Sequence, residues 1–144
     1  MRFRLFVFLL ASLILAGVAP AVAQSNADSV DAAKQVAQEW LALIDANKYQ
    51  QSWSEAASIL TSQVTAEQWA AQIQQVHGQL GAKESRALIA ARYTDSLPNM
   101  PKGDYVIAQY EATYGGKATV ETLTLMKDQD AWRVAGYFIR PQEQ

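Results

Sequence analysis

The sequence predicts an α+β domain in which three N-terminal helices pack on a four-stranded antiparallel sheet. Apolar residues recur at helical spacing through the first half of the chain, as far as Leu80. From Glu84 the apolar pattern changes to a period of two, which is typical of strands. The pair Gly115-Gly116 lies between two strand-like runs and indicates a two-residue hairpin turn, so these strands run antiparallel.

The first predicted helix follows a polar leader over residues 24–30, which we expect to be flexible. Asp28 or Ser29 can cap the start of this helix, and Asn47 marks its end. Its apolar stripe is formed by Ala33, Val36, Ala37, Trp40, Leu41 and Ile44. A second, shorter helix follows, and its apolar face is formed by Tyr49, Trp53, Ala56, Ala57 and Leu60.

The third predicted helix has the clearest start signal. Thr65 and Gln68 stand three residues apart and match a capping box, in which each side chain satisfies the other residue's backbone N–H. Gly78 and Gly81 are expected to end this helix, because glycine readily adopts the backbone conformation found just after a helix.

Four strands are predicted over residues 85–93, 105–114, 118–127 and 132–140. The hairpin at Gly115-Gly116 fixes the register of its two strands, so that Tyr110 lies opposite Glu121. The core face of this hairpin is then formed by Val106, Ala108, Tyr110, Ala112, Leu123 and Leu125. For the last strand, matching apolar faces places Gly136 opposite Glu121 and directs Trp132, Val134 and Phe138 to the core.

Glu121 is the candidate ligand-binding residue, together with Tyr110 and Gly136. A carboxylate on an apolar face must be paired, solvated or shifted in pKa. In one interpretation Glu121 forms the polar floor of a small pocket, where Gly136 leaves a gap and the Tyr110 hydroxyl donates a hydrogen bond. In the other, Glu121 lies at the rim of the sheet, or a lysine, an arginine or a backbone group satisfies it.

Other candidate residues favour structural roles. His77 is the only histidine, stands at a helix end, and is more typical of a solvated or capping residue than of a catalyst. The four tryptophans are Trp40, Trp53, Trp69 and Trp132, and they indicate a core filled by large side chains rather than an aromatic binding site. We identify no catalytic residue set, no metal site and no cofactor motif.

The N-terminus predicts a cleaved secretory signal over residues 1–23. A basic start with Arg2 and Arg4 precedes an apolar run, and the triplet Ala21-Val22-Ala23 matches a cleavage site. An uncleaved anchor is the alternative. Removing 23 of the 144 residues leaves 121, and we expect a single periplasmic or secreted domain over residues 31–141.

The charge distribution argues against nucleic acid and against anionic membranes as partners. The formal net charge of the whole chain is −2, and removing Arg2 and Arg4 makes it −4. The remaining basic residues are scattered singly along the sequence, so they predict no basic patch.

Several short segments resemble a family of bacterial secreted proteins labelled domain of unknown function 4019. The resemblance runs from about Ala32 to Arg140, and it implies no known activity or catalytic residues. It rests on Trp40-Leu41, Asp45-Ala46, Lys48-Tyr49, Ser52-Trp53, Trp69, Gly103-Asp104-Tyr105, Glu121-Thr122 and the most specific segment, Trp132-Arg133-Val134-Ala135-Gly136-Tyr137-Phe138.

The order of elements is similar to the cone-shaped fold of nuclear transport factor 2 and ketosteroid isomerase. Enzymes of that fold carry an acid–base carboxylate or histidine inside the cone. The similarity therefore implies such a role for Glu121, which is the comparable residue in this chain.

Three functions remain open from the sequence. The first is a non-catalytic periplasmic module, without a cofactor, that binds a small ligand or another protein. The second is a small cone-fold enzyme, such as an isomerase, dehydratase or hydrolase, that uses Glu121 beside Tyr110. The third is a structural homodimer formed through the sheet face opposite the core, where we expect the apolar residues Ile107, Val120, Met126, Tyr137 and Ile139.

Overall fold

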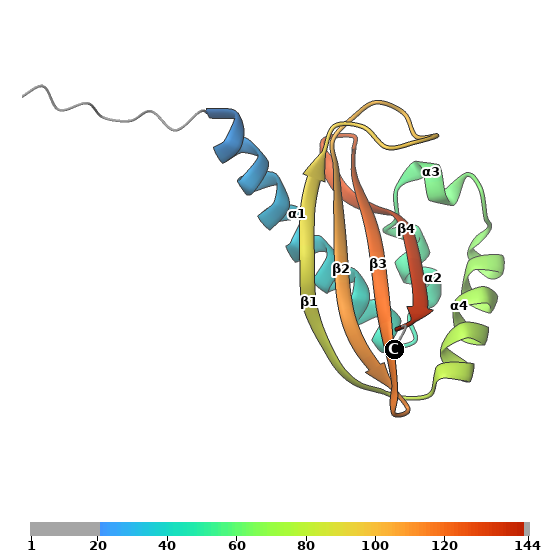
Figure 1. Cartoon of the computed structure of the whole chain (residues 1–144). Coiled ribbons are helices and arrows are strands. Elements are labelled where there is room, and N and C mark those ends of the chain that lie inside the picture. Colours follow the sequence, from blue (N-terminus) through green and yellow to red (C-terminus); the bar gives the residue numbers. More distant parts are fainter. Residues whose placement is uncertain (1–20, 143–144) are drawn as a thin grey trace, which may run out of the picture.

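A computed structural model describes residues 21–142, in which four helices precede a four-stranded sheet (Figure 1). Residues 1–20, which include most of the predicted signal peptide, lie outside the described residues. The elements are α1 (Ala21–Asp45), α2 (Tyr49–Ser54), α3 (Ser58–Thr61), α4 (Ala66–Leu80), β1 (Lys83–Thr94), β2 (Tyr105–Tyr114), β3 (Lys117–Asp128) and β4 (Ala131–Pro141). The strands are antiparallel and follow one another in sequence order, which confirms the α+β class.

The helix α1 is longer than expected. We expected a cap at Asp28 or Ser29 and a flexible leader over residues 24–30, but the helix continues through all of these residues back to Ala21. These first turns extend beyond the sheet in Figure 1, and residues 21–25 are exposed. The predicted apolar stripe is confirmed, because Ala33, Ala37, Trp40, Leu41 and Ile44 are all buried in the second half of α1.

The predicted second helix is two helices, so the chain has four rather than three before the sheet. The break falls at Ala57, whose backbone is extended, with φ −66° and ψ 151°. Its N–H donates a 2.8 Å hydrogen bond to the carbonyl oxygen of Val134 in β4. Because the Ala57 N–H bonds to the sheet, it cannot continue the hydrogen bonds of α2, and a new helix, α3, begins after it.

The start of α4 is the capping box predicted from the sequence. The Gln68 N–H donates to the Thr65 hydroxyl at 3.2 Å, and the Thr65 N–H donates to the Gln68 side-chain oxygen at 3.1 Å. At the other end, Gly81 has φ 89° and follows the helix, whereas Gly78 lies inside it. Of the two glycines expected to end α4, one therefore does so.

The register of the β2–β3 hairpin agrees with the prediction, but that of β4 does not. Tyr110 lies opposite Glu121, as expected. In β4 the residue Ala135 is an extra, bulged residue, so that Val134 pairs with Leu125 while Gly136 pairs with Thr124. A bulge reverses the alternation of side chains. Beyond Ala135, the odd-numbered residues of β4 therefore face the core, and Gly136 is not opposite Glu121.

Two further bulges interrupt β1. The pairing with β2 shifts between Lys83 and Ser85 and again between Leu88 and Ala90, so Glu84 and Ile89 are the extra residues. Lys83 and Arg86, three residues apart, consequently share the core face of the sheet, although strict alternation would separate them.

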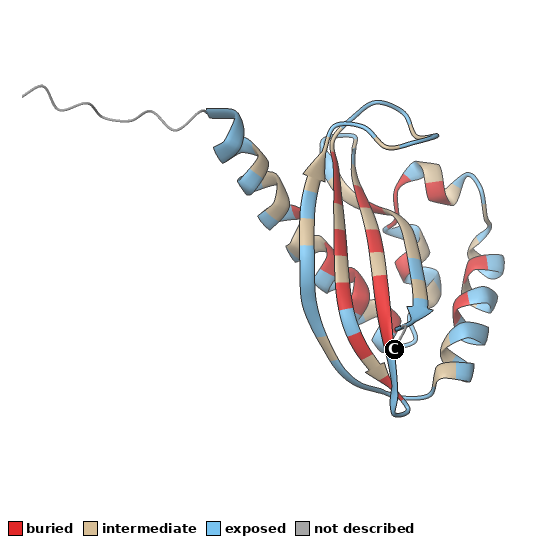
Figure 2. Cartoon of the chain, in the orientation of Figure 1, coloured by how far each residue is buried: buried red, intermediate tan, exposed pale blue. Residues whose placement is uncertain are grey.

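A single core lies between the helices and one face of the sheet. Figure 2 shows the buried residues gathered on β2, β3 and the second half of α1. We call the opposite face, in front of which no helix lies in Figure 1, the outer face. The interpretation of the tryptophans as core residues is confirmed for Trp40 and Trp69, which are buried, while Trp53 and Trp132 are partly buried against the same core.

Candidate functional site

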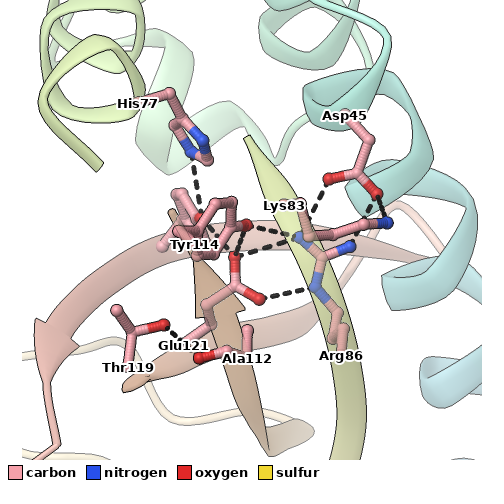
Figure 3. Close-up of polar contacts among 9 residues, drawn as sticks. Asp45, His77, Lys83, Arg86, Ala112, Tyr114, Thr119 and Glu121 are labelled. Carbon is pink, nitrogen blue, oxygen red and sulfur yellow. Dashed lines mark hydrogen bonds and ion pairs between the residues drawn. The ribbon is translucent and has the colours of Figure 1, made fainter. Parts of the chain in front are cut away.

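A cluster of hydrogen-bonded polar side chains lies on the core face, at the end of the sheet near the hairpin turn (Figure 3). We call it the Glu121 network. Its members are Asp45 at the end of α1, Lys83 and Arg86 on β1, Tyr114 on β2, Glu121 on β3 and Tyr137 on β4.

Glu121 is completely buried, and both of its carboxylate oxygens are occupied. Arg86 donates to one oxygen from Nε at 2.5 Å and to the other from Nη2 at 3.1 Å. That second oxygen also accepts from the hydroxyls of Tyr114, at 2.7 Å, and Tyr137, at 2.6 Å. Of the two interpretations open from the sequence, the geometry shows the one in which an arginine satisfies the carboxylate.

Arg86 connects Glu121 to the end of α1. Its Nη1 and Nη2 atoms donate to the two carboxylate oxygens of Asp45 at 2.7 and 2.9 Å, a bidentate pair. Lys83 donates to the same carboxylate at 2.6 Å. The network therefore contains two negative and two positive charges, and each charge has an opposite partner within hydrogen-bond distance.

The environment fixes the protonation of these groups. Burial and the negative charge on Glu121 raise the pKa of Tyr137, and the same two causes raise that of Tyr114, so both phenols keep their protons. Burial alone would raise the pKa of Asp45, but hydrogen bonds from Arg86 and Lys83 hold it below its usual value. Burial opposes the charge of Arg86, yet bonds to the two carboxylates raise its pKa overall.

The bulges assemble this network. The bulge at Ile89 in β1 turns Arg86 to the core face, and the bulge at Glu84 places Lys83 on the same face. The bulge at Ala135 in β4 turns Tyr137 to the core face in the same way. Without them, the alternation of side chains would leave Tyr137 on the outer face, where the sequence pattern had placed it.

His77 in the last turn of α4 lies next to the network. Its ring is 5.4 Å from that of Tyr114 at a steep angle and is stacked on that of Tyr137 at 6.3 Å. The Nε2 atom of His77 is 3.3 Å from the Tyr137 hydroxyl oxygen. Burial lowers the pKa of His77, and although the charge on Glu121 opposes this shift, the neutral ring is favoured. His77 is thus partly buried and hydrogen-bonded rather than a solvated helix end.

A cleft of about 640 Å³ opens beside the network. Its walls are the corner between α1 and α2, the last turns of α4 and the start of β1. It is lined by Ile44, Asp45, Asn47, Tyr49, Gln74, His77, Gly78, Gly81, Ala82, Lys83 and Tyr114. The side chains of Asp45 and Lys83 remain 23% and 34% exposed, so the charged end of the network reaches the solvent here.

The other two residues proposed from the sequence do not contact the carboxylate of Glu121 through hydrogen bonds. Tyr110 lies opposite Glu121, but its buried hydroxyl has no hydrogen-bond partner within residues 21–142. Gly136 pairs with Thr124 on the outer face, and a Cβ there would contact Phe138 and Thr124. A ligand-binding role for Glu121, Tyr110 and Gly136 stays a prediction.

Sequence reasoning did not find the residues that pair with Glu121. It predicted that an arginine or a lysine could pair with Glu121, but it identified neither Arg86 nor Tyr137 as a partner. One signal was available: Arg86 stands in a strand rich in alanine, and the buried carboxylate of Glu121, two strands away in the sheet, requires a cation.

The fold and the site define a small α+β domain with a polar cleft backed by a buried ion-pair network. The chain belongs to the family DUF4019, proteins of unknown function, whose family model matches residues 36–137, and this confirms the resemblance noted from the sequence. No curated protein and no solved structure matches the chain. Among the described helices, none is long and apolar enough to span a membrane.

Proposed function

We propose that this protein is an exported, non-catalytic domain that binds a small ligand in the cleft between α1, α4 and β1. The cleft itself carries the proposal. Its volume of about 640 Å³ falls in the range of small-molecule sites, and it combines polar groups with the rings of Tyr49 and His77. The network behind it joins all four strands to the end of α1 and holds them in fixed positions, which suits a preformed site.

The state of Glu121 supports binding over catalysis. A general base has to come within hydrogen-bond distance of the proton that it removes. Glu121 has no exposed surface, and four hydrogen bonds from three side chains occupy its oxygens. An enzyme that used this carboxylate would first have to break its pairing with Arg86, which is costly in a buried site.

The relationship to the nuclear transport factor 2 cone remains part of this proposal. Its support is the arrangement of helices against one face of a bent antiparallel sheet, together with a polar cluster on that face (Figure 1). Export is supported by the basic, apolar and small-residue order of residues 1–23. N-terminal sequencing of protein from the cell envelope is expected to begin at or next to Gln24, and an intact Met1 would contradict export with cleavage.

Filling the cleft provides the direct test. Gly78 lines it, and a Cβ built there meets no atom within 4 Å. The substitution Gly78→Leu is therefore expected to occupy the cleft while leaving the fold intact, because leucine also favours helix more than glycine does. The matched control is Gly78→Ala, which leaves most of the space open.

The measurement is an NMR fragment screen on ¹⁵N-labelled protein purified from the cell envelope. We expect hits that move the amide signals of cleft residues in the wild type and in Gly78→Ala, and that no longer do so in Gly78→Leu. Hits that bind Gly78→Leu as well as the wild type, or a complete lack of hits at the cleft, would contradict the proposed function.

A further inference from the structure

We infer that the ligand of this cleft is a small uncharged molecule rich in hydroxyl groups, a sugar or polyol, and that Nδ1 of His77 accepts one of its hydrogen bonds. This inference rests on the proposed function and specifies the chemistry of the same site. It follows from the tautomer of His77, from the pairing of the charges around the cleft, and from the groups that remain without a protein partner.

The hydrogen bonds determine the tautomer of His77. The hydroxyl of Tyr137 has one proton, and it donates that proton to the carboxylate of Glu121 at 2.6 Å, since an ionised carboxylate can only accept. The contact of 3.3 Å between the Tyr137 oxygen and His77 Nε2 is then a hydrogen bond only if Nε2 carries the ring proton. The neutral ring has one N–H, so Nδ1 is an acceptor.

The Nδ1 atom of His77 is not fully buried. Within residues 21–142 it has no hydrogen-bond partner, and it is not among the buried side-chain atoms that lack one. Because His77 lines the cleft, the structure presents an acceptor on its wall that no protein group uses.

The charges around the cleft are already compensated. Asp45 pairs with Lys83 and Arg86, and Arg86 also pairs with Glu121. Among the residues that line the cleft, Asp45 and Lys83 carry charge, and they are bonded to each other at 2.6 Å. Among the described residues that line the cleft, an anionic or cationic ligand would find no unpaired counter-charge, so it would lose hydration there without compensation. The site therefore favours an uncharged ligand.

The remaining polar groups of the cleft include both donors and acceptors. Gln74 makes no side-chain hydrogen bond within the described residues, and Asn47 uses its side-chain oxygen to accept from the Tyr49 hydroxyl, which leaves its NH₂ group for a ligand. Tyr49 contributes a partly buried ring beside them. A hydroxyl group both donates and accepts, so several hydroxyls on one compact ligand match this set together with Nδ1 of His77.

The test uses three sugars of the same size that differ in charge. Glucose, glucuronate and glucosamine are titrated separately at neutral pH into ¹⁵N-labelled wild-type protein, with Gly78→Ala and Gly78→Leu as open and filled controls. Glucose is expected to shift the signals of the cleft and to bind about tenfold more tightly than either charged sugar, because a charged group desolvated without a partner is penalised. Gly78→Leu is expected to abolish the shifts.

The role of His77 is tested with two substitutions and one spectrum. His77→Phe keeps an aromatic ring but removes the acceptor, and it is expected to weaken glucose binding about tenfold, the usual size of one lost hydrogen bond to a ligand. His77→Gln restores an acceptor and is expected to recover part of the affinity. A ¹⁵N spectrum of the histidine ring in the wild type is expected to show a protonated Nε2 and a bare Nδ1. Thermal denaturation of both variants checks that they are folded.

The outcomes separate this inference from the proposed function. If the charged sugars or charged fragments shift the cleft signals and glucose does not, the ligand class is wrong while the cleft remains a binding site. A ring proton on Nδ1, or unchanged glucose binding by His77→Phe, overturns the role of His77. If no sugar and no fragment shifts the cleft signals, the inference and the proposed function both fail.

Discussion

At the scale of single residues, Glu121 and Arg86 form the most consequential contact in the domain. The carboxylate is completely buried and the arginine side chain is 11% exposed, so water compensates neither charge to a useful extent. Breaking a buried pair by removing one partner leaves the other charge uncompensated, whereas replacing both can be close to neutral.

The substitution Arg86→Met is therefore expected to destabilise the fold by ~3–5 kcal/mol. The double variant Arg86→Met/Glu121→Met is expected to cost less than the sum of the two single variants, because it leaves no unpaired charge between them. Urea denaturation of the four proteins of this cycle measures the coupling free energy. Strictly additive losses would show that the pair does not act as a unit.

The pH dependence of stability provides a second prediction at this scale. Burial lowers the pKa of His77 in the folded state below the 6.5 of the unfolded chain. Between these two values the unfolded state binds more protons, so the free energy of unfolding rises with pH. The contribution of neutral His77 is thus complete above pH 6.5 and is lost as the pH falls below it.

We expect the denaturation midpoint of the wild type to decrease as the pH is lowered from 8 to 5. The midpoint of His77→Gln is expected to depend less on pH over the same range. The titration of Asp45 does not contribute to the change between pH 5 and 8. Its folded pKa lies below 3.8, so its contribution is present above 3.8 and disappears as the pH falls through the folded value. Identical pH profiles for the wild type and His77→Gln would contradict the burial of the ring.

The sequence predicted where Glu121 lies but could not identify its partners. Its position follows from a Gly-Gly turn and strict alternation in β2 and β3, and both are local properties of the sequence. Arg86 and Tyr137 reach it through bulges at Ile89 and Ala135. A bulge leaves no mark in the apolar pattern, so the residues beyond it are assigned to the wrong face when strict alternation is assumed. For this reason the sequence placed Tyr137 on the outer face.

At the scale of elements, features that depend on residues close together in the sequence were predicted more accurately than features that depend on contacts between distant segments. The capping box at Thr65 depends on residues three positions apart, and it is present as expected. The division of the second helix at Ala57 depends on a hydrogen bond to Val134, more than seventy positions away, and nothing near Ala57 in the sequence indicates it.

Removal of the cap at Thr65 is expected to destabilise the domain. Thr65→Ala loses the hydroxyl that accepts from the Gln68 N–H, at a cost of ~1 kcal/mol. Thr65→Ser keeps an equivalent hydroxyl and serves as the matched control. Chemical denaturation distinguishes the two variants, and an equal loss for both would mean that the cap contributes little.

The hairpin turn offers a second matched pair. Gly115 and Gly116 both have positive φ, 52° and 77°, so alanine at either site costs about 1–2 kcal/mol of backbone strain. A Cβ at Gly115 would also lie 2.7 Å from the carbonyl oxygen of Leu80, whereas one at Gly116 meets nothing within 4 Å. Gly115→Ala is expected to lose ~1–3 kcal/mol more than Gly116→Ala in thermal or urea denaturation. Equal losses would show that the hairpin and the end of α4 separate easily.

At the scale of the whole molecule, the helical layer, the antiparallel sheet and the β2–β3 register were predictable, because they follow from periodicity and turn chemistry. The homodimer predicted through the outer face remains a prediction, with a changed set of residues. Tyr137 pairs with Leu123 and Ile139 with Glu121, so both face the core rather than the outer face. Phe138 takes their place on the outer face and is 70% exposed, on the same face as Ile107 and Met126, whereas Val120 on that face is already buried.

Light scattering at micromolar concentration is expected to give the mass of a dimer for the wild type and of a monomer for Phe138→Glu, because a charge in an apolar contact between two copies is unfavourable. Phe138→Leu is the control that keeps the surface apolar. A monomeric mass for the wild type would exclude the dimer. Ile139→Glu is unsuitable for this test, because it would place a second carboxylate next to Glu121.

The bulges of β1 also affect how the protein behaves at high concentration. β1 is an edge strand, and a long, regular edge exposes N–H and C=O groups that can recruit a strand from another copy and start aggregation. Bulges at Glu84 and Ile89 interrupt that row, and the charges of Lys83 and Arg86 point inward from it. The local irregularities that bring a cation to Glu121 therefore also protect the chain from edge-to-edge association, so a change that straightened β1 would both break the ion pair and create a site for aggregation.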